Sequence, residues 1–216
     1  MFKPFIGILA AVVAFPGAAL AAPVLSDVTG AVYDLEGATI ANLDAALSLI
    51  EGEDADARFT VSALDYPNGS EPISPSETTL VSEFLGADAA SLTGRDFTLE
   101  QSVFVFSGQI LLEEGAQTFT VASDDGFRLM IGDALISEAL GPRGFTATSA
   151  TVDAGVGLVS FMLVFYNDLG EGGIEFRVDG EIAEAFDAEV VPLPGALALM
   201  APILAGGALV RRQRRP

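Results

Sequence analysis

The central part of the chain alternates apolar and polar residues in short runs. The clearest run spans residues 159–165, and similar runs cover residues 103–112, 118–131 and 174–178. Alternation with a period of two is typical of strands that bury one face. Gly and Asp clusters separate these runs, so the pattern predicts roughly seven short strands packed as an antiparallel β-sandwich.

Two stretches near the N-terminal side have helical periodicity instead. Asn42 precedes apolar residues that share one helix face between residues 43 and 50, and Asn is a preferred N-cap. A second pattern follows Ser76 and stops at Gly86, as glycine commonly ends a helix. We therefore expect a mainly β fold with one or two short helices beside the sandwich.

Both ends of the chain are apolar. Residues 1–21 carry Lys3, an apolar stretch and an A-x-A cleavage site at residues 19–21, which together indicate a signal peptide. Residues 193–210 contain no charge and are followed by four arginines, so they predict a C-terminal transmembrane helix. The positive-inside rule puts the basic tail in the cytoplasm and the rest of the chain outside.

The C-terminal sequence also resembles a known sorting signal. The residues that carry the likeness are Val191, Pro192, Leu193 and Pro194, with Arg211 and Arg212 in the basic end. They resemble the VPLPA variant of the PEP-CTERM signals, found on exported proteins of exopolysaccharide-producing bacteria, although Gly195 stands where alanine is usual. The resemblance implies processing by an exosortase-type enzyme at the cell envelope. An ordinary C-terminal anchor would give the same topology.

These features divide the chain into a signal peptide (1–21), an exported β-sandwich domain (22–190) and a sorting signal with a basic tail (191–216). The exported part holds all 30 acidic residues and only five arginines. Such a surface repels nucleic acid, so no nucleic-acid partner is expected. It favours cations, although an acidic surface is also typical of proteins from saline habitats.

The absent residue types restrict the chemistry. The chain has no His and no Cys, which excludes a Ser-His-Asp triad, a cysteine nucleophile and a His-based zinc site. A glycosidase that uses two carboxylates stays open in principle, but with so many acids the mere presence of a pair indicates nothing. We expect a non-enzymatic protein.

The segment Asp124-Asp125-Gly126 joins two alternating runs. Taken alone it favours a hairpin, since Asp-Gly is typical of type I′ turns. Its surroundings, however, resemble the protective-antigen-type (PA-fourteen) β-sandwich domain, with an aromatic strand at 118–121, Ser-Asp-Asp-Gly at 123–126, and Arg128-Leu129 and Ile131-Gly132 in place of the family's Arg-Leu-x-Ile-x-Gly strand. The likeness extends over about residues 28–179 and implies extracellular carbohydrate recognition. In the adhesin branch of that family the two aspartates are joined by a cis peptide and hold calcium.

The resemblance implies further calcium ligands in the loop after the run at 159–165, because calcium takes about 6–8 oxygen ligands. If Phe165 is the inward aromatic residue of that strand, Asn167 matches the ligand asparagine, and Leu169 and Glu171 offer backbone carbonyls. A register shifted by one would make Asp168 the ligand instead. The alternative is an ordinary polar hairpin loop.

The candidate sugar contacts match the adhesin branch less completely than the candidate calcium ligands do. The adhesin branch has a Trp in this loop and the chain contains none, which leaves Tyr166 as a substitute stacking surface and Asp168 as a polar contact. Arg128 is a third candidate for ligand binding, with a structural ion pair as its alternative. The sequence thus supports two hypotheses: a calcium-dependent surface protein that binds a glycan or exopolysaccharide, or a purely structural surface or matrix protein without a small ligand.

Overall fold

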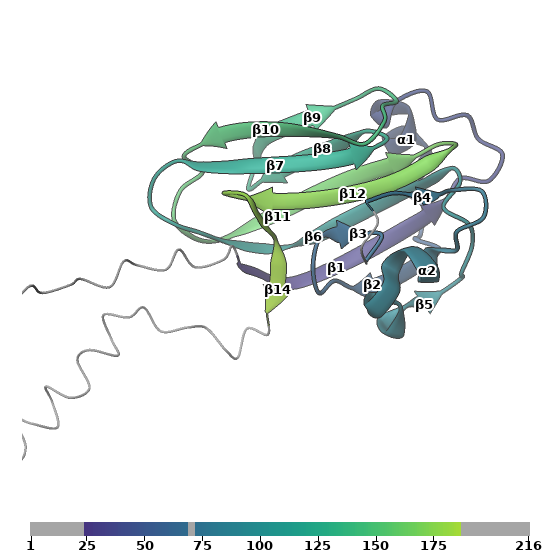
Figure 1. Cartoon of the computed structure of the whole chain (residues 1–216), viewed down its shortest axis with the longest axis horizontal. Coiled ribbons are helices and arrows are strands. Elements are labelled where there is room, and N and C mark those ends of the chain that lie inside the picture. Colours follow the sequence, from purple (N-terminus) through teal and green to yellow (C-terminus); the bar gives the residue numbers. More distant parts are fainter. Residues whose placement is uncertain (1–23, 69–71, 187–216) are drawn as a thin grey trace, which may run out of the picture.

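Two β-sheets packed face to face make up the computed structural model, which describes residues 24–68 and 72–186 (Figure 1). The predicted β-sandwich is therefore confirmed. The predicted signal peptide and sorting signal lie outside the described residues. In the described part of the chain, no helix has the length and apolar character needed to cross a bilayer.

The larger sheet is built around three neighbouring strands of 11 residues each, β1 (Val24–Asp34), β6 (Ser102–Leu112) and β11 (Gly157–Asn167). Its order is β5 (Thr93–Gly94), β2 (Ala57–Thr60), β1 (Val24–Asp34), β6, β11, β8 (Phe127–Ile131) and β9 (Ala134–Ala139). A short last strand, β14 (Glu184–Phe186), pairs in parallel with β1.

The smaller sheet has β7 (Gln117–Asp124) and β12 (Glu171–Val178) at its centre. Its order is β10 (Thr146–Val152), β7, β12 and β13 (Glu181–Ile182), and β3 (Asp65–Tyr66) and β4 (Ser74–Pro75) also pair with β12. All pairings in this sheet are antiparallel.

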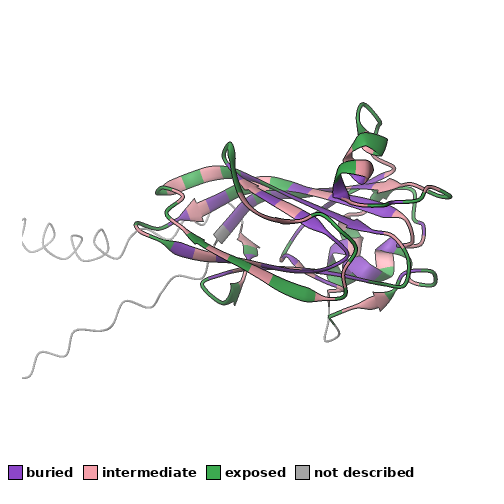
Figure 2. Ribbon diagram, turned by 90° about the horizontal axis from the view of Figure 1, so that it is seen from above, coloured by how far each residue is buried: buried purple, intermediate pink, exposed green. Residues whose placement is uncertain are grey.

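The core lies between the inward faces of the two sheets, as the buried stripes along the strands show (Figure 2). The alternation seen in the sequence has the predicted register, because Phe104 and Phe106 of β6 and Phe165 of β11 point inward and contact one another. Burying each side chain of this size contributes about 1.5–3 kcal/mol to the stability of the fold. Since no cysteine is present, this apolar core replaces any disulfide framework.

Both predicted helices form. In α1 (Leu43–Ile50) the Asn42 side chain accepts the Ala45 N–H at 2.9 Å, which confirms the expected N-cap. The helix covers part of the outer face of the larger sheet. The second helix, α2 (Val81–Leu85), ends at Gly86 as predicted but begins later than Ser76, because the Ser76 hydroxyl donates to the Gly170 carbonyl instead. The 3₁₀-helix η1 (Gly86–Ser91) follows.

The long strands separate the two ends of the sandwich. Leu158 at the start of β11 opposes Leu111, which also opposes Val24, so both described chain ends lie at one end together with β14. Asn167, at the close of β11, lies at the other end (Figure 1). Ten residue steps along a strand separate these ends by about 33 Å.

Candidate functional site

The Asp124-Asp125-Gly126 segment crosses from one sheet to the other. Asp124 is the last residue of β7 and opposes Gly173 in the smaller sheet, whereas Phe127 begins β8 in the larger sheet. The hairpin interpretation is therefore wrong, because a hairpin would join neighbouring strands of one sheet. The peptide bond between Asp124 and Asp125 is cis. Because the segment passes from one sheet to the other, the two carboxylates lie at the rim between the sheets.

The buried Asp125 carboxylate connects two loops to this rim. Its Oδ1 accepts the Arg143 N–H at 3.1 Å, and its Oδ2 accepts the Asp168 N–H at 2.9 Å. Burial raises the pKa of Asp125, and these two backbone hydrogen bonds partly oppose that shift. Asp125 therefore positions both the loop before β10 and the loop after β11.

Asp124 is in a more strongly anionic environment. Asp124 is only 9% exposed. Burial, Asp125 and Glu171 raise the pKa of Asp124 to about 6, while the Phe145 N–H and the Arg143 charge act in the opposite direction. Burial is the largest cause and repulsion from Asp125 and Glu171 adds to it, so the ionised Asp124 carries a charge that its surroundings do not balance. A bound cation would remove that imbalance.

The loop after β11 brings further oxygen atoms to this rim. Asn167 is fully buried; its Nδ2 donates to the Leu99 carbonyl at 3.0 Å, and its Oδ1 has no hydrogen-bond partner among the described residues. The same holds for Asp168 Oδ1. Buried acceptors without a partner are costly, so each is a place where a ligand is expected.

The rest of this loop is anchored through its backbone. The Gly170 carbonyl accepts the Ser76 N–H at 2.7 Å, and the Gly170 N–H donates to Glu77 at 3.2 Å. Leu169 is 55% exposed, and Glu171 begins β12 close enough to raise the pKa of Asp124. The structure thus brings the predicted residues of loop 167–171 together with the two aspartates.

This donor set fits a hard cation such as calcium, which prefers oxygen ligands. Among residues 24–68 and 72–186, no three His, Cys, Asp or Glu side chains gather as a metal cluster. A calcium ion at the rim would therefore depend on the Asn167 amide oxygen and on backbone carbonyls as well as on the two aspartates.

The prediction that Tyr166 offers a stacking surface is wrong. Its ring is fully buried under α1, in a small apolar cluster with Leu43, Val103 and Val164. The physical reason is strand parity, because even-numbered residues at this end of β11 point to the outer face, which the helix covers. Burial, Asp125 and Asp168 raise the pKa of the Tyr166 hydroxyl, so it stays protonated.

Arg128 has the ion pairs that its structural alternative predicted. Its guanidinium pairs with Glu138 of β9 at 2.8 Å and with Asp44 of α1 at 3.1 Å. It therefore joins the edge of the larger sheet to the helix, as the structural alternative predicted. Partly exposed pairs of this kind contribute about 0–1 kcal/mol each.

Two residues near the aspartates were missed by the sequence reasoning. The Phe145 backbone N–H lies near the Asp124 carboxylate and lowers its pKa, and the ring of Phe145 is partly exposed and packs against Gly173. Arg143 lies over the Phe127 ring at 5.8 Å and donates to Thr148 at 2.9 Å. The sequence marks this segment only as an exposed Gly-Pro loop, and its place beside the aspartates depends on tertiary contacts.

The fold can be compared with known proteins. A PA14 sugar-binding domain from an RTX adhesin is similar, with 25% identity, a TM-score of 0.59, and coverage of 74% of this chain and 98% of that domain. The PA14 domain of the antifreeze protein MpAFP has 18% identity, a TM-score of 0.61, and coverage of 79% and 88%. No protein-family model and no curated protein matches the sequence.

Proposed function

We propose that the chain is an exported surface or matrix protein that binds a glycan or exopolysaccharide in a calcium-dependent manner, without catalysis. The observation that carries this proposal is the hydrogen bond from the Asp168 N–H to the Asp125 carboxylate, at 2.9 Å, which joins the aspartate pair to the loop after β11. The preceding residue of that loop, Asn167, has a buried amide oxygen without a partner among the described residues. The similar fold of a PA14 domain described as sugar-binding supports it.

In this proposal calcium would be held by Asp124, Asp125 and Asn167 Oδ1, with backbone carbonyls of Leu169 and Glu171. The bound ion would supply positive charge to the rim and coordinate sugar hydroxyls. Asp125 keeps the two loops in place through its hydrogen bonds to the Arg143 and Asp168 backbones. The Asp168 side chain offers one more acceptor at the same rim.

Phe145 replaces Tyr166 as the aromatic contact. It is partly exposed and lies beside Asp124, so its ring can pack against the C–H face of a sugar while the carboxylates bind hydroxyls. The proposed sugar site would then combine one apolar face with several oxygen ligands, as small-molecule sites commonly do.

Export and attachment follow from the sequence signals at the two ends. The rim lies at the end of the sandwich opposite to Val24 and Phe186, about 33 Å away along β11. A domain attached to the envelope through residues 191–216 would therefore present its site away from the attachment. The motif at Val191–Pro194 and the basic tail would be read by an exosortase-type enzyme.

Thermal unfolding of the full-length protein with calcium, and separately with magnesium, tests the ion site. At a hundredfold excess over its Kd, calcium should stabilise the protein by about 2.7 kcal/mol. Asp124→Asn should abolish this gain, while the matched control Asp179→Asn keeps it. Equal stabilisation by magnesium, or none by calcium, would contradict the ion site. A glycan array run with calcium and with EDTA tests sugar binding.

One observation favours the structural alternative. Both oxygens of Asp125 already accept backbone N–H groups, so the carboxylate joins the two loops without any ion. A purely structural surface or matrix protein would lose stability in Asp125→Ala, yet its melting temperature would not change on adding calcium or EDTA. The calcium titration therefore separates the two functions.

A further inference from the structure

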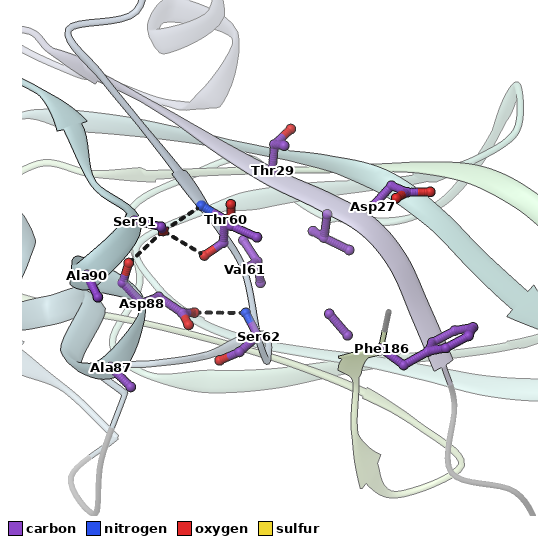
Figure 3. A pocket seen from close by; sticks show the side chains of 12 residues that line it. Asp27, Thr29, Thr60, Val61, Ser62, Ala87, Asp88, Ala90, Ser91 and Phe186 are labelled. Carbon is purple, nitrogen blue, oxygen red and sulfur yellow. Dashed lines mark hydrogen bonds between the residues drawn. The ribbon is translucent and has the colours of Figure 1, made fainter. Parts of the chain in front are cut away.

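A cleft lies on the flank of the sandwich, where β1, β2, η1 and β14 meet (Figure 3). Its volume is about 680 Å³. Ligand-binding pockets commonly measure about 300–1,000 Å³, so the cleft can hold a molecule the size of a mono- or disaccharide. The lining of this cleft includes no residue of the Asp124 rim.

An irregularity in β1 opens this cleft. β14 pairs with β1 at residues 24–26, β2 pairs with it at residues 29–32, and neither register includes Asp27. The pairing of β1 with β6 shifts at the same place, and Asp27 has a φ of 53°. β14 and β2 therefore pair with separate parts of β1, and the gap between these two strands leaves a recess along β1.

The lining of the cleft combines buried apolar side chains with exposed hydroxyl groups. Val28 and Val61 line the cleft and are buried. The partly exposed Phe186 ring stands at one side (Figure 3). The hydroxyls of Thr60 and Ser62 are exposed there and make no hydrogen bond within residues 24–68 and 72–186. Saccharides present the matching groups, since their C–H faces are apolar and their hydroxyls both donate and accept.

A buried carboxylate completes the polar side. Asp88 uses Oδ2 to accept both the Ser62 N–H at 3.0 Å and the Tyr66 hydroxyl. These two bonds fix the carboxylate in place beside the cleft, and its second oxygen makes no hydrogen bond within residues 24–68 and 72–186. A rigid acceptor next to free hydroxyls gives the site directionality without requiring any side chain to become ordered.

The charge of the lining selects the class of ligand. Asp27 and Asp88 are its only ionisable residues, and it contains no Lys or Arg. Phosphate, sulfate and uronic acids would meet only like charge here, so an anionic ligand is disfavoured. We propose that this cleft is a second, calcium-independent binding site for a neutral saccharide.

This proposal goes beyond the calcium-dependent site and does not require it. Asp34 lies at the end of the sandwich where Asn167 lies. Seven residue steps along β1 lead from Asp27 to Asp34, a distance of about 23 Å. One sugar unit cannot reach both places. A protein with both sites would hold two glycan chains, or two parts of one chain, and so gain avidity for a polysaccharide matrix.

Saturation-transfer NMR on the full-length protein in EDTA tests the cleft. The neutral probes are glucose, lactose and N-acetylglucosamine, with glucuronate as the anionic counterpart. We expect transfer to at least one neutral probe and none to glucuronate. Ala90→Trp, on the exposed wall of the cleft, should remove the signal, and Phe186→Ala should weaken it. The matched control is Ala134→Trp, at an exposed position on β9.

The two proposals fail separately. No transfer from the neutral probes in EDTA, or transfer that survives both Ala90→Trp and Phe186→Ala in folded protein, would overturn the second site. If Asp124→Asn loses calcium-dependent binding but keeps saturation transfer in EDTA, the transfer comes from the cleft and the calcium response comes from the Asp124 rim. Thermal melts of each variant confirm that the fold is retained.

Discussion

Two Asp-Gly pairs in this protein have the same local sequence and different structural roles. Asp179-Gly180 joins β12 to β13 within one sheet, and its residues have φ values of 51° and 94°. This is the backbone of a type I′ hairpin turn. Asp125-Gly126 instead carries the chain between the two sheets, and neither residue has a positive φ. The dipeptide alone therefore does not determine which connection forms.

The two glycines are required for different physical reasons. At Gly126 a Cβ would lie 2.4 Å from the Ala139 carbonyl oxygen and 2.7 Å from the Tyr166 ring, so the position needs the space. At Gly180 no atom lies within 4 Å of such a Cβ, and the position needs the left-handed backbone. The first requirement is set by tertiary packing and the second by the local turn.

The two aspartates differ in the same way. Asp179 is exposed and accepts the N–H of Thr118 at 2.7 Å, which fastens one turn to a neighbouring strand. Asp125 is buried and accepts N–H groups from two loops that are remote from it in sequence. Substitutions at the matched positions should therefore have unequal effects.

The largest expected effect is that of Gly126→Ala. Because the new methyl group would meet a backbone carbonyl, we expect a loss of about 3 kcal/mol in the free energy of unfolding. Gly180→Ala should lose about 1 kcal/mol from its positive φ. Chemical denaturation measures both. Gly144→Ala, where neither restriction applies, is the control. Equal losses at residues 126 and 180 would contradict the distinction.

Asp125→Ala should have the next largest effect. It leaves the N–H groups of Arg143 and Asp168 without their acceptor, and we expect about 2–3 kcal/mol of destabilisation. Asp179→Ala removes one exposed hydrogen bond, for about 1 kcal/mol. Denaturation in EDTA measures both losses without any contribution from calcium. A smaller loss in Asp125→Ala than in Asp179→Ala would refute the role of Asp125 in joining the loops.

A pH series in EDTA tests Asp124. Its pKa is about 6 in the folded protein against 3.8 for an ordinary Asp, so the folded state binds the proton more tightly. Stability should fall as pH rises from about 4 to 6, by about 2 kcal/mol, and the loss is complete above that range.

Asp124→Asn should remove this part of the pH dependence. In EDTA the variant should be more stable than the unchanged protein at pH 8, because it has neither the buried charge nor its repulsion from Asp125 and Glu171. Asp179→Asn should keep the slope. The difference between the two variants isolates Asp124 from other titrating acids, and identical slopes would show that it does not titrate in this range.

The smallest effect is expected for Asp179→Asn. Asn tolerates the left-handed backbone and keeps an oxygen that can accept the Thr118 N–H, so the change should be about 0.5 kcal/mol or less. Asp125→Asn should cost more, since one carboxylate oxygen becomes an NH₂ group that faces a backbone N–H donor. Parallel denaturation curves compare the two.

Much of the fold could be predicted because its causes are local. The alternation at 159–165 predicted which face of β11 is buried, and Asn42 and Gly86 marked a helix start and a helix end. Each of these features depends on neighbours within a few positions in the chain. The start of α2 was misplaced because Ser76 bonds to Gly170, which is 94 residues away.

By itself, the sequence determined the sandwich, the two helices, the acidic surface and the candidate residues from Asp124 to Glu171. Tertiary structure alone decided that Asp125-Gly126 crosses between sheets, that Tyr166 is buried under α1, and that Phe145 lies beside Asp124. The physical reason is the range of the interactions. Periodicity and capping act between near neighbours, whereas these three outcomes depend on packing between segments about 20 to more than 100 residues apart, as in the contact of Leu43 with Tyr166.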